Sequence, residues 1–347
     1  MDEMVDMIEG FDALIHCNDA SGREEELSDI ENTIMSDEMS TSEETVEEMN
    51  SETGEYAGEE MIHGGGMKNR SFLTFNASVS NKKVITDLQD QPFQIMASTR
   101  NYLTNQTITS YPKSRNENLL LHMNYITRVF NNNAIETNSK ERFSLQQYAK
   151  LAERVGTKDI LIHMPCNVIE VKNIAQGLSI INDELLSRGM IVHLEIAAWS
   201  QELITARKIR SRKDVVQYIS EFIDEVISHI NEYKAGRFML VFDTAHLYAL
   251  GAESKDQMQL FEKYRKWMKY CHLNGNINSK LTSDSHAPIM SDKSKLKDWQ
   301  ALSAYIAKLG LICIAEITKF GKSWEEWSEY AKEYGFELVK YHDQLSI

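Results

Sequence analysis

The stretch Val241-Phe242-Asp243-Thr244-Ala245-His246 decides how this chain folds. The run 237–242 is short, follows a glycine-containing turn and is rich in large apolar side chains, which predicts a buried strand. A carboxylate and then an imidazole follow it directly. Because α/β barrels place their site residues at the carboxyl ends of strands, Asp243 and His246 can face one cleft. The alternative is an Asp that caps a helix beside a buried His.

The same pattern, an apolar run that ends in a His or a carboxylate, occurs at five other places. The residues at or near the ends of these runs are His122, His163, Glu195, His272 and Glu316. Amphipathic helical segments separate the runs, most clearly over 214–232, where the apolar residues are spaced by three and four. Six such endings predict one convergent cluster of imidazoles and carboxylates.

In chain order, the apolar runs predict eight strands that alternate with helices. The predicted strands are 71–79, 93–97, 119–122, 159–163, 191–195, 238–243, 269–273 and 312–316, and the predicted helices are 143–155, 168–188, 214–232, 258–267, 296–309 and 324–334. Eight β/α units of this length are typical of a (β/α)8 TIM barrel. The competing α/β architecture, an open doubly wound sheet, is disfavoured because no glycine-rich phosphate loop follows the first strand.

The charge is unevenly distributed along the chain. Residues 1–68 contain 21 acidic and two basic residues, which leaves 31 acidic and 35 basic residues in 69–347. This composition predicts an acidic, low-complexity and disordered tail before a single catalytic domain over 69–347. The tail is interpreted as a solvating segment. The alternatives are a docking site for a protein partner and an inhibitor in cis that mimics nucleic-acid charge.

Composition also bears on the cellular compartment. The four cysteines have no CxxC spacing, which favours a reducing, intracellular environment. No apolar run has the length of a membrane span, and the acidic N-terminus lacks the pattern of a signal peptide. We therefore expect an intracellular monomer that is neither secreted nor bound to a membrane, in the nucleus or the cytoplasm.

Asp284 and His286 extend the predicted cluster in the loop after the seventh strand. The candidate metal ligands are then His122, His163, Glu195, Asp243, His246, His272, Asp284, His286 and Glu316. Nine ligands exceed the need of one four-coordinate zinc ion and suit two or three ions bridged by carboxylates. Nitrogen and oxygen donors without thiolate fit Zn²⁺ or Mn²⁺. Such clusters generate hydroxide and hold the oxygens of a phosphoryl group.

The order of these motifs resembles the endonuclease IV family of apurinic/apyrimidinic (AP) endonucleases, which belongs to the xylose-isomerase-like TIM-barrel superfamily. The resemblance covers about residues 71–347. The segments that carry it are His122-Met-Asn-Tyr125-Ile (family H-x-x-Y-L), Leu194-Glu195 (L-E), Phe242-Asp243-Thr244-Ala245-His246 (D-T-C-H), His272-Leu273-Asn274 (H-L-N-D), Asp284-Ser285-His286 (D-R-H) and Ala315-Glu316 in the last strand.

The resemblance implies three zinc ions per chain, with Mn²⁺ as an alternative at one site. His122 and His163 would hold the first ion, Glu195 would bridge it to a second ion held by Asp243, His272 and Glu316, and His246, Asp284 and His286 would hold the third. The implied activity is hydrolysis of the phosphodiester 5′ to abasic sites in double-stranded DNA, a step of base-excision repair, by a metal-bridged hydroxide. Glu195 and Glu316 would be catalytic, with Glu316 orienting the hydroxide.

Five further residues are candidates for contact with DNA. By the resemblance, Tyr125 would line the pocket for the extruded sugar, and Arg100 or Asn101 would be the wedge that enters the duplex. Trp199, in the loop after Glu195, is a candidate for a DNA or pocket contact, and Lys280 is a candidate for a phosphate contact. His193 also falls on the fifth strand, where we predict a core histidine rather than a ligand.

The chain departs from the family pattern around the ligands. It has His163-Met164-Pro165 for H-P-G, 196–200 for the loop T-A-G-x-G, Gly275 for an Asp, Ser285 for an Arg, and Glu316-Ile317-Thr318 for E-T-P. The predicted metal ligands are all present, whereas glycine and arginine residues that approach DNA are replaced. A shifted preference among abasic, 3′-blocked and damaged-base substrates is therefore an open alternative.

Two other functions fit the same residues. Glu195, Asp243, His272 and Glu316 would suffice for the single divalent ion of a sugar isomerase or epimerase, which would not need the other five ligands. A relative that binds DNA without catalysis would bind the lesion and not turn it over.

The acidic tail generates a testable expectation. If residues 1–68 inhibit in cis by their charge, their deletion should strengthen DNA binding at low salt, and the gain should shrink as salt screens it. Binding titrations of the full-length and truncated proteins over a salt series measure this, and equal affinities at low salt would contradict it.

Overall fold

The computed structural model describes residues 70–77, 85, 91–96, 103–113, 116–124, 127–136, 139–207, 215–233, 237–278, 285–316 and 323–339. The predicted acidic tail lies outside the described residues, so its disorder, its role and the proposed domain boundary stay predictions.

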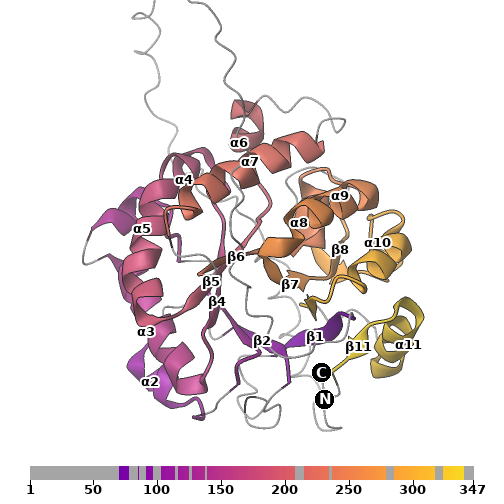
Figure 1. Cartoon of the computed structure of the whole chain (residues 1–347), viewed down its shortest axis with the longest axis horizontal. Helices are drawn as coiled ribbons and strands as arrows, with labels where there is room; N and C mark the ends of the chain where they lie inside the picture. Colours follow the sequence, from indigo (N-terminus) through magenta and orange to yellow (C-terminus); the bar gives the residue numbers. More distant parts are fainter. Residues whose placement is uncertain are drawn as a thin grey trace, which may run out of the picture.

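Eight parallel strands form a closed barrel (Figure 1). They are β1 (Phe72–Ala77), β2 (Phe93–Met96), β3 (Leu119–His122), β4 (Asp159–His163), β5 (Ile191–Glu195), β6 (Phe238–Asp243), β7 (Met268–His272) and β10 (Ile312–Ala315). Each strand pairs in parallel with its neighbours, and β10 pairs with β1 to close the ring. The predicted TIM barrel is confirmed, and β3, β4, β5 and β6 have the predicted bounds.

Helices surround the barrel, as Figure 1 shows. They are α2 (Asn105–Thr109), α3 (Lys140–Val155), α4 (Val168–Lys172), α5 (Ile174–Glu184), α6 (Gln201–Ala206), α7 (Val215–Ile230), α8 (Thr244–Ala249), α9 (Ser254–Tyr264), α10 (Trp299–Ile306) and α11 (Trp324–Tyr334), with 3-10 turns η1 (Asn132–Ile135), η2 (Leu186–Arg188) and η4 (Arg265–Trp267). Beyond the barrel strands, β8 (Asn274–Asn276) pairs with β9 (His286–Pro288) in a hairpin, and β11 (Glu337–Leu338) pairs with β1. Among the described residues, no helix is long and apolar enough to cross a membrane.

Local sequence explains where the helices begin and end. The Ser139 side chain accepts a hydrogen bond from the Arg142 N–H at the start of α3, and Gly156 ends this helix with a φ of 75°. The single helix predicted over 168–188 is wrong, because it is divided into α4, α5 and η2. The break lies at Asn173, whose side-chain amide donates to the Ile169 carbonyl, a local bond that competes with helix continuation.

The alternation of side chains divides the core into two layers. The larger layer lies between the strands and the helices and includes Cys271 and Cys313. A smaller apolar cluster consists of Leu120, Leu161, Val241, Tyr270, Ile312 and Ile314. Tyr270 and His272 lie on the same side of β7 because they are two residues apart. The small cluster therefore lies inside the barrel, below the strand ends that carry the predicted ligands.

A buried ionic network occupies the other end of the barrel interior. One carboxylate oxygen of Asp159 lies 2.7 Å from His193 Nε2, and the other lies 2.6 Å from Lys269 Nζ and 2.9 Å from the Tyr270 hydroxyl. His193 is fully buried, which confirms it as a core histidine. Burial alone would raise the pKa of Asp159, but the charges of His193 and Lys269 outweigh it and lower this pKa to about 2.

This network predicts how stability depends on pH. Since the folded pKa of about 2 is below the unfolded value of 3.8, ionised Asp159 stabilises the fold by about 2 kcal/mol above pH 4, and this contribution is lost as the pH falls toward 2. We expect Asp159→Asn to be less stable than the wild type at pH 7, with a difference that narrows below pH 4. Urea unfolding of both proteins from pH 7 to 3 measures it, and a pH-independent difference would contradict the assignment.

Candidate metal centre

Glu195, at the end of β5, is the residue around which the site is arranged. Its side chain is buried, and four imidazoles surround it. Oε2 lies 3.0 Å from His163 Nε2 and 3.4 Å from His122 Nε2. Oε1 lies 2.9 Å from His272 Nδ1 and 3.3 Å from His246 Nδ1. Side chains from the ends of β3, β4 and β7 and from α8, which follows β6, thus meet at one carboxylate, as the sequence predicted for these residues.

The charges of these groups depend on one another. Burial alone would raise the pKa of Glu195, but the nearby charges of His272 and His163 hold it well below its usual range. Burial alone would lower the pKa of His272, but Glu316 and Glu195 raise it to about 10. Burial likewise acts to raise the pKa of Glu316, yet the charge of His272 keeps that pKa low. Both carboxylates therefore stay ionised in the barrel interior and can attract cations.

Asp243 has two roles at the end of β6. Its Oδ1 accepts hydrogen bonds from the backbone N–H groups of Ala245 (2.6 Å) and His246 (3.2 Å), so it caps α8. Its Oδ2 accepts a bond from Asn274 Nδ2 (2.7 Å) and lies 3.5 Å from His272 Nδ1. The capping role and the cluster role, which the sequence offered as alternatives, are thus both present, one on each oxygen.

The β8–β9 hairpin after β7 delivers a further histidine. Asn276 in β8 is paired with His286 in β9. His286 Nδ1 lies 3.3 Å from Glu316 Oε2, and its Nε2 lies 3.7 Å from Asp243 Oδ2. A hairpin in a βα loop thus brings a residue that is distant in sequence from Asp243 to the same cluster.

Three overlapping groups of side chains have the spacing that a metal ion requires. Within each group the ligand atoms lie within 4.8 Å of one another, and the groups are His122–His163–Glu195, Glu195–Asp243–His272 and Asp243–His246–His286. The first group contains the ligands expected for the first ion, and the second contains three of the four expected for the second ion, without Glu316, with Glu195 shared between the two groups. In the third, Asp243 stands with the two histidines, and the expected ligand Asp284 lies outside the described residues. The donor set of nitrogen and oxygen atoms, with carboxylates placed to be shared, fits Zn²⁺ or Mn²⁺.

Backbone carbonyls orient two of the imidazoles. His122 Nδ1 lies 2.6 Å from the Met123 carbonyl oxygen, and His246 Nδ1 lies 2.8 Å from that of Ile196. In a neutral ring this contact places the proton on Nδ1 and the lone pair on Nε2. Carbonyl partners of this kind are characteristic of metal-binding histidines, because they fix the tautomer and the direction of the ring.

Two amide residues that the sequence analysis did not predict complete the site. Gln94 in β2 places its Nε2 2.9 Å from Glu316 Oε1 and its Oε1 2.9 Å from His272 Nε2. Asn274 donates to Asp243 and, at 3.3 Å, to Glu316 Oε2. The only sequence signal for Gln94 is a polar residue inside the apolar run 93–96. Asn274 lies in the segment His272-Leu273-Asn274, for which the resemblance implies a role of His272 alone.

The candidate DNA contacts have different outcomes. Tyr125, Arg100, Asn101 and Lys280 lie outside the described residues, so their roles stay predictions. The proposed DNA or pocket contact of Trp199 needs correction because its side chain is only 1% exposed.

The surroundings of Trp199 give its ring a packing role. The ring packs edge-on against Phe222, with 5.2 Å between ring centroids, and the Arg207 guanidinium lies 5.8 Å from the Trp199 ring centre. Residues 196–199 belong to the segment that stands in place of the family's glycine-rich loop. All four are apolar and buried.

Packing also explains one departure from the family pattern. A Cβ atom at Gly275 would lie 2.5 Å from Ser294 Oγ and 3.1 Å from the Pro288 carbonyl oxygen. The Asp of the H-L-N-D motif therefore has no room at Gly275 in this hairpin unless the segment around Ser294 shifts.

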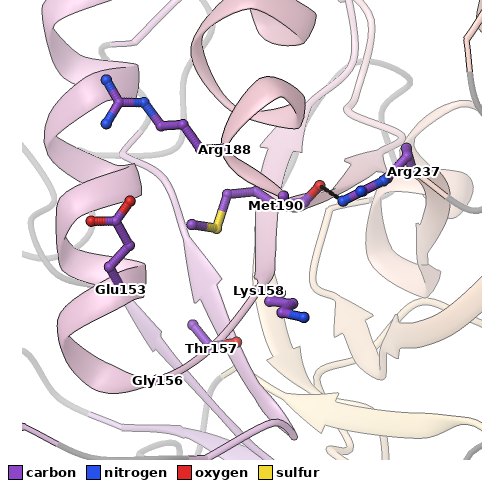
Figure 2. A pocket seen from close by; sticks show the side chains of 8 residues that line it. Glu153, Gly156, Thr157, Lys158, Arg188, Met190 and Arg237 are labelled. Atoms are coloured by element: carbon purple, nitrogen blue, oxygen red, sulfur yellow. Dashed lines mark hydrogen bonds between the residues drawn. The ribbon is translucent and has the colours of Figure 1, made fainter.

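A separate cavity is lined by none of these ligands, and Figure 2 shows the residues that line it. It has a volume of about 410 Å³ and is lined by turns that precede β4, β5 and β6, at the opposite end of the barrel. Lys158, Arg188, Arg237 and Glu153 line it. Arg188 lies in the last turn of η2, where the helix dipole favours a cation, so its position is explained by the stability of this turn. We place the chemistry at the buried ligand cluster rather than in this cavity.

Comparisons with known proteins bear on the fold alone. No protein-family model matches the chain, and no curated protein matches its sequence. Among solved structures, a D-tagatose 3-epimerase-like protein has a TM-score of 0.51 at 13% identity, with 76% of this chain and 98% of that chain covered. A 3-keto-D-glucoside 4-epimerase from E. coli has a TM-score of 0.45 at 11% identity (77% and 98% covered). The IolI protein with a zinc atom has 0.46 at 12% identity (76% and 96% covered).

The similarity to the D-tagatose 3-epimerase-like structure supports the (β/α)8 barrel fold. The name of the D-tagatose 3-epimerase-like structure describes that protein and does not decide between the AP endonuclease expectation and the sugar isomerase or epimerase alternative. At these identities the similarity extends to the fold and not to the reaction, so the choice between the two depends on the site itself.

Proposed function

We propose that this protein is a hydrolase with a multinuclear metal centre that cleaves DNA phosphodiesters 5′ to abasic sites. The observation that carries the proposal is the position of four histidines beyond the set that a single-ion isomerase needs. His122, His163 and His246 lie within 3.4 Å of Glu195, and His286 lies 3.3 Å from Glu316. Four extra imidazoles around shared carboxylates, three of them buried and that of His163 partly exposed, suit more than one ion.

The proposed ligand sets follow the three groups of side chains. His122 and His163 would hold one ion. Asp243, His272 and Glu316 would hold a second ion, and Glu195 would be shared between these two. His246 and His286 would hold a third ion together with Asp284. When bound, such ions would supply a nucleophile at neutral pH and stabilise charge on the phosphoryl oxygens.

Glu316 is the candidate for orienting the attacking water. Its carboxylate stays ionised, and two amides fix its direction: Gln94 Nε2 lies 2.9 Å from Oε1 and Asn274 Nδ2 lies 3.3 Å from Oε2. It can therefore accept a hydrogen bond from water in a constant direction. Glu195 and Asp243 are buried, so bulk water would be kept from this part of the site, which would strengthen each electrostatic contact there.

The choice of DNA is supported by charge and by motif order. Residues 69–347 have 35 basic and 31 acidic residues, a balance compatible with a phosphate-backbone partner. The order of the ligand motifs resembles endonuclease IV over most of the chain.

The proposal predicts a single cut 5′ to the lesion in a duplex oligonucleotide that carries one abasic-site analogue. Activity should be lost after removal of metal by a chelator and restored by Zn²⁺, because the ligands remain while the ions leave. An undamaged duplex is the control. Binding to the lesion without a cut, in protein shown to contain metal, would contradict the proposal and favour a relative without catalysis.

The second candidate is a sugar isomerase or epimerase. It is supported by the names of the structural neighbours and by the contact of Glu195, Asp243 and Glu316 with His272, because these four residues would suffice for one divalent ion. This candidate gives no catalytic task to His163 or His246.

Substitution of these two histidines separates the candidates. We expect His163→Ala and His246→Ala each to lower incision by about 100-fold or more, because each would remove a metal ligand. His229→Ala, in the last turn of α7, is the matched control and should retain full activity. The same variants are assayed for epimerisation of a panel of ketohexoses. If the wild type turns over one of these sugars and both substitutions leave that turnover unchanged, the second candidate is established instead.

A further inference from the structure

Gln94 is a buried polar residue in the wall of the barrel. It lies in the middle of β2 between Phe93 and Ile95, and its exposed fraction is 0%. Its side chain contacts two of the predicted ligands, with Nε2 2.9 Å from Glu316 Oε1 and Oε1 2.9 Å from His272 Nε2. Gln94 thus connects the ligand ends of β7 and β10 from a third strand.

The chemistry of the three groups fixes the direction of both hydrogen bonds. An ionised carboxylate only accepts, so the amide nitrogen of Gln94 must face Glu316 and the amide oxygen must face His272. An amide oxygen also only accepts, so His272 Nε2 must carry a proton. In the neutral imidazole the lone pair is then on Nδ1. The opposite amide orientation would place oxygen against the Glu316 carboxylate and is unfavourable.

The Nδ1 atom selected in this way faces the carboxylates. It lies 2.9 Å from Glu195 Oε1, 3.5 Å from Asp243 Oδ2 and 3.5 Å from Glu316 Oε2. His272 would therefore bind an ion through Nδ1, whereas the backbone contacts of His122 and His246 favour Nε2 in those rings. The difference follows from the Gln94 amide.

We infer that Gln94 is a positioning residue of the metal centre, which holds His272 in its Nδ1-binding tautomer and fixes the direction of Glu316. The inference rests on the metal-binding part of the proposed function and not on its substrate. It applies equally to a DNA hydrolase and to a one-ion isomerase, because both would use His272 and Glu316.

Replacement of Gln94 by Met tests the role of its hydrogen bonds. Met is apolar and close to Gln in length and flexibility, so Gln94→Met retains most of the packing and removes both bonds. Gln147→Met is the matched control, since Gln147 is also a buried glutamine and lies on α3 in the helix layer. Zn²⁺ affinity is measured without substrate by competition with a chromophoric chelator, and the visible spectrum of the Co²⁺-loaded protein reports ligand geometry.

We expect Gln94→Met to weaken Zn²⁺ binding by about 10- to 100-fold and to alter the Co²⁺ spectrum, with both properties unchanged in Gln147→Met. Thermal melting in excess chelator compares the folding of the two variants without metal. Wild-type affinity and spectrum in a folded Gln94→Met would overturn the inference alone. A wild type without measurable metal affinity would overturn the proposed function as well.

A second measurement needs no variant. In the Zn²⁺-loaded wild type with ¹⁵N-labelled histidine, we expect one ring to bind the ion through Nδ1 and to retain a protonated Nε2 that exchanges slowly. Assignment by comparison with His272→Gln identifies that ring. Coordination of His272 through Nε2 would overturn the inference even if Gln94→Met failed to fold.

Discussion

The buried carboxylate of Glu195 is the constraint on which the rest of the site depends. An ionised carboxylate in a barrel interior is costly unless opposite charge or hydrogen-bond donors surround it. Here His122, His163 and His272 approach it from the ends of β3, β4 and β7, and His246 approaches it from α8, directly after β6. Closure of the barrel brings these strand ends together, so the fold is a requirement for the charge to be tolerated.

The barrel interior is divided along its axis into an ionic network, an apolar layer and the candidate centre. Asp159 lies at the amino end of β4 and His193 in the middle of β5, and the apolar cluster around Tyr270 lies between Asp159 and the ligands. Both polar regions contain charged groups in contact with partners. The network around Asp159 stabilises the fold, and the cluster around Glu195 holds the candidate ligands. The apolar layer lies between these two regions.

The strand-end ligands could be predicted from the sequence because β4, β5 and β6 are buried apolar runs with one polar residue at the end. The position of Gln94 could not, since its role depends on β7 and β10, which are distant in sequence. Trp199 was assigned to the pocket from its loop, but packing against Phe222 decided its place. The α4–α5 break was missed because the hydrophobic period continues through Asn173, where one side-chain bond interrupts the helix.

The most direct test of the account is the location of bound metal by anomalous X-ray diffraction at the zinc edge. The account predicts more than one peak, including one between His122, His163 and Glu195 and one near His246 and His286. A single peak among Glu195, Asp243, His272 and Glu316 in crystals grown with excess Zn²⁺ would contradict it. The centre would then be mononuclear, and the isomerase or epimerase function would be favoured.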